Sequence, residues 1–186
     1  MTSYLGNFLL WSSLLFAISQ FFISRKSNQQ NLKFISISVI GLLISSTASF
    51  FLLMYAYVIS DFSLLNVFQN SHTTKPLLYK ISGVWGNHEG SMLLWIIVLT
   101  IFNYFIFKLN SKKNYFFILK SLETQALITI GFILFTVLTS NPFERMISNE
   151  QDGLGFNPIL QDPALAIHPP LLYIGYVGFS AVFSMS

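Results

Sequence analysis

The sequence lacks cysteine and contains few charged residues. None of its 186 residues is a cysteine, and only 9% are charged, against about a quarter in ordinary soluble proteins. Without thiols, the chain itself forms no disulfide, no cysteine-ligated metal centre and no thiol redox pair. Because 53% of the residues are hydrophobic, the composition excludes an ordinary soluble domain and predicts an integral membrane protein.

The basic residues form no cluster of the kind that binds nucleic acid. The ten lysines and arginines are split among short loops, whereas a nucleic-acid surface needs them together on one folded face. The expected surroundings are membrane lipid and no nucleic acid. The first apolar run begins at Leu5 without a basic segment before it, so we interpret it as a retained helix and not as a signal peptide.

Long apolar runs predict about five transmembrane helices, since a span needs roughly 20 apolar residues. The predicted spans are residues 5–23, 34–59, 92–107, 121–138 and 171–186, within a single membrane domain of residues 1–186. Residues 60–91 and 139–170 are the predicted loops on one side of the membrane. The predicted fold class is therefore an all-α polytopic membrane helix bundle.

Two local patterns describe how these spans are expected to pack. The second span carries a cluster of small hydroxyl residues, which favour close approach of helices: Ser45, Ser46, Thr47 and Ser49. At the entrance of the fourth span, Lys120 and Glu123 have the spacing of an ion pair on one helix face. Both patterns predict packing rather than chemistry.

The distribution of the basic residues predicts the orientation. Seven of the ten fall in two loops on the same side: Arg25, Lys26, Lys33, Lys108, Lys112, Lys113 and Lys120. The positive-inside rule therefore predicts that the N-terminus lies outside. His72, His88 and His168 would lie outside with it.

His168 is the first candidate ligand. It stands directly before Pro169 and Pro170, and a residue before proline is biased away from helical geometry. We therefore expect the last helix to begin at Pro169 or Pro170, with the imidazole at its outer mouth. There it is either a ligand to an amphipathic metal-bearing plane such as haem or an interfacial histidine that caps the helix. Three Asx-Pro steps precede it, each a typical turn or helix start: Asn141-Pro142, Asn157-Pro158 and Asp162-Pro163.

The second candidate group is His88 with Glu89. Gly86 and Gly90 bracket the pair and allow a tight backbone, and Trp85 is expected at the depth of the membrane interface. One histidine and one carboxylate are too few ligands for a zinc site, and no nucleophile elbow accompanies them. Glu89 could orient His88, contact a substrate or place its charge at a helix N-terminus, so both functional and anchoring roles stay open. For His72, in another polar loop, we expect only a solvated surface position.

The stretches around His88 and His168 resemble the family of CcmF, which is the large membrane protein of the cytochrome c maturation haem lyase. KISGVWGNHEGSMLLW, residues 80–95, is similar to the family's WGxHEGSxLLW segment. Three later segments resemble the same family in the same order: TSNPF at 139–143, NPILQDP at 157–163 and HPPLLYIGYVGFS at 168–180.

The resemblance implies a role in attaching haem b to the thiols of an apocytochrome c at the outer face of a membrane. In the family, a Trp-rich segment holds the haem between two outer histidines. His168 matches the first of these and would be a haem axial ligand. For His88, Glu89 and Trp85 the resemblance implies a positioning role. The membrane would be the mitochondrial inner membrane, which twenty phenylalanines, typical of an AT-rich organelle genome, favour, or a bacterial plasma membrane.

The sequence departs from the family after the HPP segment. The Trp-rich segment, the second outer histidine and the ligands of a further membrane haem lie beyond it in the family. We therefore expect the chain to match the N-terminal portion of a split lyase, completed by a C-terminal CcmF-like polypeptide. The alternative is a repurposed structural subunit of a respiratory-chain complex such as cytochrome oxidase. A transporter fragment is less favoured, because no span carries an unpaired central charge.

Overall fold

The chain folds into a bundle of long α-helices. The computed structural model describes residues 1–26, 32–109, 114–147, 152–155 and 162–186. The described residues form seven α-helices and no strand: α1 (Thr2–Arg25), α2 (Leu32–Val58), α3 (Leu65–Asn70), α4 (Leu77–Gly83), α5 (His88–Lys108), α6 (Tyr115–Thr139) and α7 (Pro163–Met185). The predicted fold class, an all-α polytopic bundle, is confirmed.

Five of these helices are long and apolar enough to cross a membrane. They are α1, α2, α5, α6 and the part of α7 from Ala166 to Met185. At about 1.5 Å per residue, the shortest, with 20 residues, spans about 30 Å, the thickness of a bilayer's hydrocarbon core. The number of predicted spans therefore agrees with the structure, although several helices are longer than the runs that predicted them.

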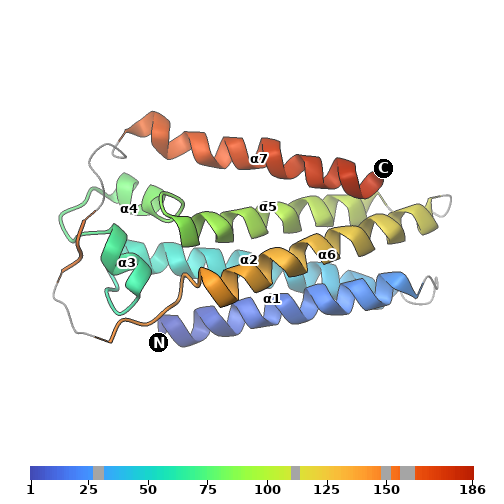
Figure 1. Ribbon diagram of the computed structural model, residues 1–186, viewed down its shortest axis with the longest axis horizontal. Coiled ribbons are helices and arrows are strands. Elements are labelled where there is room, and N and C mark those ends of the chain that lie inside the picture. Colours follow the sequence, from blue (N-terminus) through green and yellow to red (C-terminus); the bar gives the residue numbers. More distant parts are fainter. Residues whose placement is uncertain (27–31, 110–113, 148–151, 156–161) are drawn as a thin grey trace.

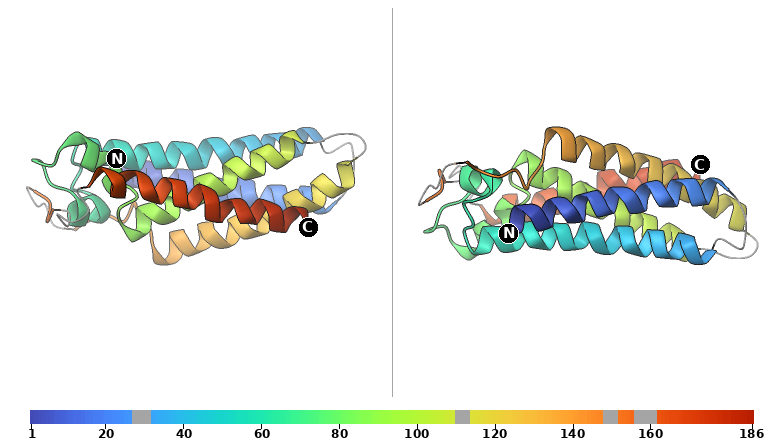
Figure 2. Two further views of the ribbon diagram at one scale, coloured as in Figure 1. Left: turned by 90° about the horizontal axis from the view of Figure 1, so that it is seen from above. Right: turned by 90° about the horizontal axis from the view of Figure 1, so that it is seen from below.

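The long helices lie side by side, with α5 in contact with α2, α6 and α7 (Figures 1 and 2). In the most apolar window of α5, 50% of the residues are buried, whereas in α7 only 11% are. In Figure 1, α7 runs along one side of the bundle and α1 along the other. Within the chain, α5 is thus an interior helix and α7 a peripheral one.

Hydroxyl and amide side chains join the helices inside the bundle. Ser45 and Ser46 of α2 bond to Ser13 of α1 at 2.8 Å and to Thr100 of α5 at 3.1 Å. Gln20 of α1 exchanges two amide hydrogen bonds of 2.8 Å with Asn103 of α5. The bonds of Ser45 and Ser46 agree with the predicted packing of the hydroxyl cluster in the second span. Polar groups in apolar surroundings favour partners across helices.

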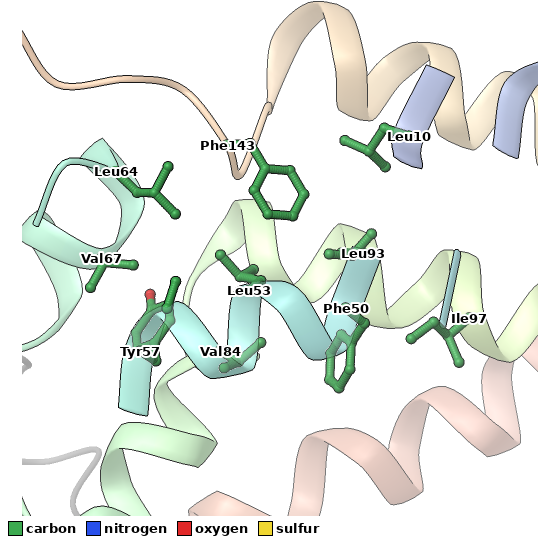
Figure 3. Packing of buried hydrophobic residues seen from close by; sticks show 11 residues of the cluster. Leu10, Phe50, Leu53, Tyr57, Leu64, Val67, Val84, Leu93, Ile97 and Phe143 are labelled. Carbon is green, nitrogen blue, oxygen red and sulfur yellow. The ribbon is translucent and has the colours of Figure 1, made fainter. Parts of the chain in front are cut away.

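One end of the bundle is covered by α3 and α4, and we call it the capped end. The N-terminus lies there, and the C-terminus lies at the opposite end (Figure 1). Phe143, from the connection after α6, is fully buried in a cluster with Leu10, Leu53 and Leu64 (Figure 3). The hydroxyls of Thr2 and Ser63 donate to the carboxylate of Asp61. Burial raises the pKa of Asp61, but these hydrogen bonds outweigh it and leave the pKa below its ordinary value.

The basic residues predicted to lie inside group at the other end. Arg25 and Lys108 are in the last turns of α1 and α5. Lys120, near the start of α6, bonds to Glu123 at 2.7 Å, as its spacing predicts. Lys112 and Lys113 lie outside the described residues. The grouping agrees with the charge pattern, and the assignment of the capped end to the outside stays a prediction.

Candidate functional site

A cavity of about 420 Å³ opens at the capped end between the α4–α5 turn and α7. Its lining comes from two distant parts of the sequence: Ser82, Trp85, Gly86, Asn87, His88 and Ser91 on one side, and Ala166, His168, Pro169, Leu172 and Tyr173 on the other. The two segments that carry the sequence motifs therefore build one cavity. Three of the four predicted site residues, Trp85, His88 and His168, line it.

The α5 side begins with an asparagine cap. The side chain of Asn87 accepts a hydrogen bond from the backbone N–H of Gly90 at 2.9 Å, so helix α5 starts at His88 and not at residue 92. The apolar run alone predicted the later start, because His88 and Glu89 are polar and were assigned to the preceding loop. A capping asparagine directly before them is the signal that could have extended the helix.

Gly90 permits a close backbone contact in this first turn. A Cβ atom at position 90 would lie 1.6 Å from the carbonyl oxygen of Val84. A residue with a side chain therefore cannot occupy the position without moving the α4–α5 turn. The prediction of a tight backbone around His88 holds at Gly90 for this steric reason.

Asn87 also ties the turn to the rest of the capped end. Its amide nitrogen donates to the Gly83 carbonyl at 2.7 Å and to the Tyr57 hydroxyl at 2.9 Å. Its oxygen accepts a second hydrogen bond, from Asn66 at 2.8 Å. The Tyr57 hydroxyl in turn donates to Asn66 at 2.7 Å. The sequence does not predict this network, since Tyr57 and Asn66 lie in other helices and carry no local signal.

Glu89 faces the Asn87 network and not the cavity. Its carboxylate accepts a hydrogen bond of 3.0 Å from Asn66, and it is the acidic residue in the first turn of α5. A carboxylate there is stabilised by the positive end of the helix dipole. Of the roles left open by the sequence, the helix-terminus role has direct geometric support. Through Asn66, Glu89 is connected to Asn87, which lines the cavity.

His88 is exposed at the cavity and held by two contacts. Its Nε2 atom lies 3.0 Å from the Ser140 hydroxyl. Its ring meets the edge of Phe135, with centroids 6.3 Å apart and planes at 88°. Both partners come from the end of α6 and the residue after it. His88 is thus oriented from α6, a contact that the sequence did not reveal.

Trp85 bridges the two walls of the cavity. Its ring stacks on Phe50 of α2, with centroids 6.3 Å apart and planes at 9°. Its indole N–H donates to the carbonyl of Ala166 in α7 at 2.7 Å. The expected interfacial tryptophan is therefore also a contact between the α4–α5 turn and α7.

His168 lies within helix α7, which corrects the sequence prediction. The helix begins at Pro163 and continues through Pro169 and Pro170, so it does not start at either of those prolines. Asp162 caps it, with its carboxylate accepting from the N–H of Ala164 at 2.7 Å. The bias of a residue before proline is overcome because the Asp162-Pro163 step has already started the helix. His168 therefore projects from the second turn, where it is exposed and lines the cavity.

Neither Asn141 nor His72 lines the cavity. Asn141 does not start a helix: its side chain accepts from the N–H of Phe143 at 2.9 Å, in a turn. Asn157-Pro158 lies outside the described residues. His72 is 39% exposed and lies 3.2 Å from Asp152, in agreement with its expected solvated position.

The side chains of the cavity suit a metal that is already coordinated within a cofactor and needs few ligands from the protein. In the described part of the chain, no group of three or more histidine or acidic side chains could hold a metal ion. The cavity instead offers two imidazoles, from His88 and His168, among aromatic and apolar walls. Ser82, only 4% exposed, also lines it, and its hydroxyl has no hydrogen-bond partner among the described residues. Such a donor set fits haem, whose iron needs one or two axial ligands and whose plane is largely apolar.

The chain is similar in sequence and in fold to proteins described as cytochrome c biogenesis proteins. The cytochrome c-type biogenesis protein CycK of Rhizobium meliloti (strain 1021) is 52% identical over 138 residues, covering 74% of this chain and 20% of the relative. CcmF of Haemophilus influenzae is 39% identical over 191 residues, covering 100% of this chain and 30% of the relative. The solved cytochrome c haem lyase CcmF has a TM-score of 0.83 at 23% identity, covering 99% of this chain and 29% of that one, and so shares its fold.

The chain thus spans between a fifth and a third of the length of these relatives. The family model for cytochrome C assembly proteins matches residues 85–186, which contain both walls of the cavity and all but Ser82 of its lining. More than half of the chain is covered by this match. The chain therefore belongs to the cytochrome C assembly protein family, and CcmF proteins are among its homologues.

Proposed function

We propose that this chain forms part of the haem-holding face of a cytochrome c haem lyase, with His168 as an axial ligand of haem b. The observation that carries the proposal is the convergence of His88 and His168 on one cavity, from helices α5 and α7. Nothing in their spacing along the chain requires this convergence. A cavity with two imidazoles, an indole and a phenol suits a flat amphipathic molecule with iron at its centre.

Each side chain has a distinct task in this proposal. His168 offers an imidazole nitrogen to the iron from the exposed wall of the cavity. Trp85, Leu172 and Tyr173 supply apolar surface that excludes water from the plane. His88, held by Ser140, orients the bound molecule from the opposite wall. Glu89 acts indirectly, since it holds the Asn66 and Asn87 network that supports the α4–α5 turn.

The chemistry itself would come from the bound group, as in other cofactor reactions. Bound haem would supply vinyl groups, to which the cysteine thiols of apocytochrome c would add. The protein's share is to hold and orient the plane at a surface that the apocytochrome can reach. The capped end would then face outside, in the mitochondrial intermembrane space or the bacterial periplasm, as the positive-inside rule predicts.

We also propose that another polypeptide completes the site. The chain corresponds to 20–30% of the length of its CycK and CcmF relatives. A C-terminal CcmF-like polypeptide that carries a Trp-rich segment is the expected partner, in the mitochondrial inner membrane or a bacterial plasma membrane. It would approach α7, whose apolar window is only 11% buried.

Substitution of His168 tests the haem role. In cells that depend on this chain, His168→Ala should abolish covalent holocytochrome c, measured by haem staining of denatured protein, while the chain stays in the membrane. His72→Ala is the matched control, because His72 belongs to the capped end and does not line the cavity. Normal holocytochrome c in the His168→Ala cells would refute the ligand assignment.

Purification in a mild detergent separates the lyase from the structural alternative. Mass spectrometry should recover a second polypeptide bearing the Trp-rich segment, together with haem. Stoichiometric respiratory-complex subunits without such a partner would instead identify a structural subunit of a respiratory complex. The two outcomes exclude each other as the main assembly.

A further inference from the structure

Two consecutive prolines within helix α7 leave backbone carbonyl groups without their helical donors. Proline has no backbone N–H, so the carbonyl four residues before it loses its hydrogen bond. For Pro170 that carbonyl belongs to Ala166. Ala166 is only 5% exposed, so water is a poor substitute, and an unpaired buried carbonyl is costly.

The indole of Trp85 supplies the missing donor. Its N–H lies 2.7 Å from the Ala166 oxygen, the distance of a normal hydrogen bond. Trp85 comes from the α4–α5 turn and not from α7. Pro170, which leaves the Ala166 carbonyl without a helical donor, and Trp85, which donates to that carbonyl, therefore belong to different walls of the cavity.

The fixed partner in this contact is the turn. Trp85 stacks on Phe50, and Asn87, two residues further on, is anchored to Gly83 and Tyr57. Helix α7, by contrast, is the least buried of the candidate spans. The hydrogen bond to Ala166, two residues before His168, therefore acts near the start of the least buried span.

We propose that Trp85 is a positioning residue for His168. Its indole N–H, through the Ala166 carbonyl that Pro170 leaves open, holds the first turns of α7 against the α4–α5 turn. We call this hydrogen bond between Trp85 and Ala166 the lock. It sets where the His168 imidazole lies in the cavity. Only its consequence for haem ligation rests on the proposed function, because the lock itself is a contact within this chain.

Spin-label distances test the lock without haem. Because the sequence has no cysteine, cysteines introduced at Tyr55 of α2 and Leu171 of α7, both exposed, are the only labelling sites. Trp85→Phe keeps an aromatic ring on Phe50 and removes the N–H. In the wild type the distances between the two labels should be narrowly distributed, and in Trp85→Phe they should be broadly distributed. Trp11→Phe, at an exposed position of α1, is the matched control and should leave the distribution narrow.

A double-mutant cycle tests whether Pro170 is part of the lock. Pro170→Ala restores an N–H that can bond to Ala166 within the helix, so Trp85→Phe should broaden the distances less in that background. Pro169→Ala restores an N–H for the carbonyl of residue 165, so it should not relieve the effect of Trp85→Phe. An unchanged distribution in Trp85→Phe, or equal effects in all three backgrounds, would overturn the proposal.

Haem absorbance gives the functional readout. In wild-type protein titrated with haemin, a Soret band that is lost in His168→Ala reports ligation by His168. Trp85→Phe should weaken this band, and Trp11→Phe should not. Absence of the His168-dependent band in the wild type would count against the proposed function, while the spin-label distances would still decide the lock. A full-strength band in Trp85→Phe would refute the positioning role.

Discussion

The two walls of the cavity are built from helices that begin alike and are held differently. Helix α5 starts behind the cap of Asn87 and places His88 at its first position, and α7 starts behind the cap of Asp162 and places His168 in its second turn. In its most apolar window, α5 is 50% buried and α7 only 11%. One wall is therefore part of the bundle's interior, and the other lies at its edge.

The contacts that restrain each wall differ in the same way. The α5 wall is fixed by the Asn87 network. The α7 wall is held by the Trp85 bond to Ala166 and, deeper in the bundle, by Gln125, which bonds to Ser180 at 3.1 Å and to Ser184 at 2.7 Å. Changes on the α5 wall should therefore unfold the capped end, whereas changes on the α7 wall should move the helix and leave the bundle folded.

The largest expected effect is the difference in stability between two Gly→Ala variants, one in α5 and one in α7. Gly90→Ala in α5 places a Cβ 1.6 Å from the Val84 carbonyl and should destabilise the protein by about 3 kcal/mol or more, as in severe overpacking. Gly175→Ala in α7 meets no atom within 4 Å and should stay within about 1 kcal/mol of the wild type. Thermal unfolding in detergent, followed by circular dichroism, measures both. Equal stability of the two variants would contradict the comparison.

Removal of the α5 cap should have the next largest effect. Asn87→Ala loses the cap and the hydrogen bonds of Asn87 to Tyr57 and Asn66, which should cost about 2–4 kcal/mol. Asn114→Ala is the control, because Asn114 precedes α6 without a side-chain capping bond. The unfolding midpoint should fall for Asn87→Ala and remain near the wild-type value for Asn114→Ala. A similar fall in both would assign no special role to Asn87.

Loosening the α7 wall should change mobility more than stability. Gln125→Leu removes the side-chain bonds to Ser180 and Ser184, and polar contacts between membrane helices contribute only about 0.6 kcal/mol on average. Amide hydrogen exchange should rise in α7. Gln20→Leu is the matched control, since Gln20 pairs with Asn103 in the interior. Increased exchange of α7 in the control as well would show that α7 is not separately held.

The smallest expected effect is a pH-dependent loss of the hydrogen bonds that Asp152 accepts, in the segment before α7. The Asp152 carboxylate accepts from the hydroxyl and the N–H of Thr73 at 2.7 and 3.0 Å. These hydrogen bonds, the hydroxyl first, hold the pKa of Asp152 below its ordinary value of 3.8. Because the folded pKa is the lower one, the stabilisation is complete above pH 3.8 and is lost as the pH falls through the folded pKa.

Hydrogen exchange against pH measures this loss. The amides of Leu154 and Gly155, which bond to Phe68 and Ser71, should stay protected from pH 7 to about pH 5 and lose protection below the ordinary carboxyl pKa. In Asp152→Asn the protection should no longer change with pH. A loss of protection that begins well above pH 5, or that persists in Asp152→Asn, would contradict control by the Asp152 carboxylate.

Much of the fold is explained by local sequence. The five long apolar helices, the hydroxyl cluster of α2 and the Lys120–Glu123 pair each depend on residues within one segment, so the sequence predicted them. Helix starts were less accurate. At α5 the polar pair His88–Glu89 concealed the first turn, and at α7 the bias of His168 before proline was outweighed by the earlier Asp162-Pro163 start.

The sequence by itself determined an all-α membrane bundle of the cytochrome C assembly family, with Trp85, His88, Glu89 and His168 as the residues to consider. These results depend on composition, spacing and motif, which are properties of the chain. Only the tertiary structure decided that His88 and His168 share a cavity, that Glu89 turns toward Asn66, and that Trp85 donates to the carbonyl opposite Pro170. The first and the last of these arrangements bring together residues about eighty positions apart, and helix packing, not local pattern, brings such residues together.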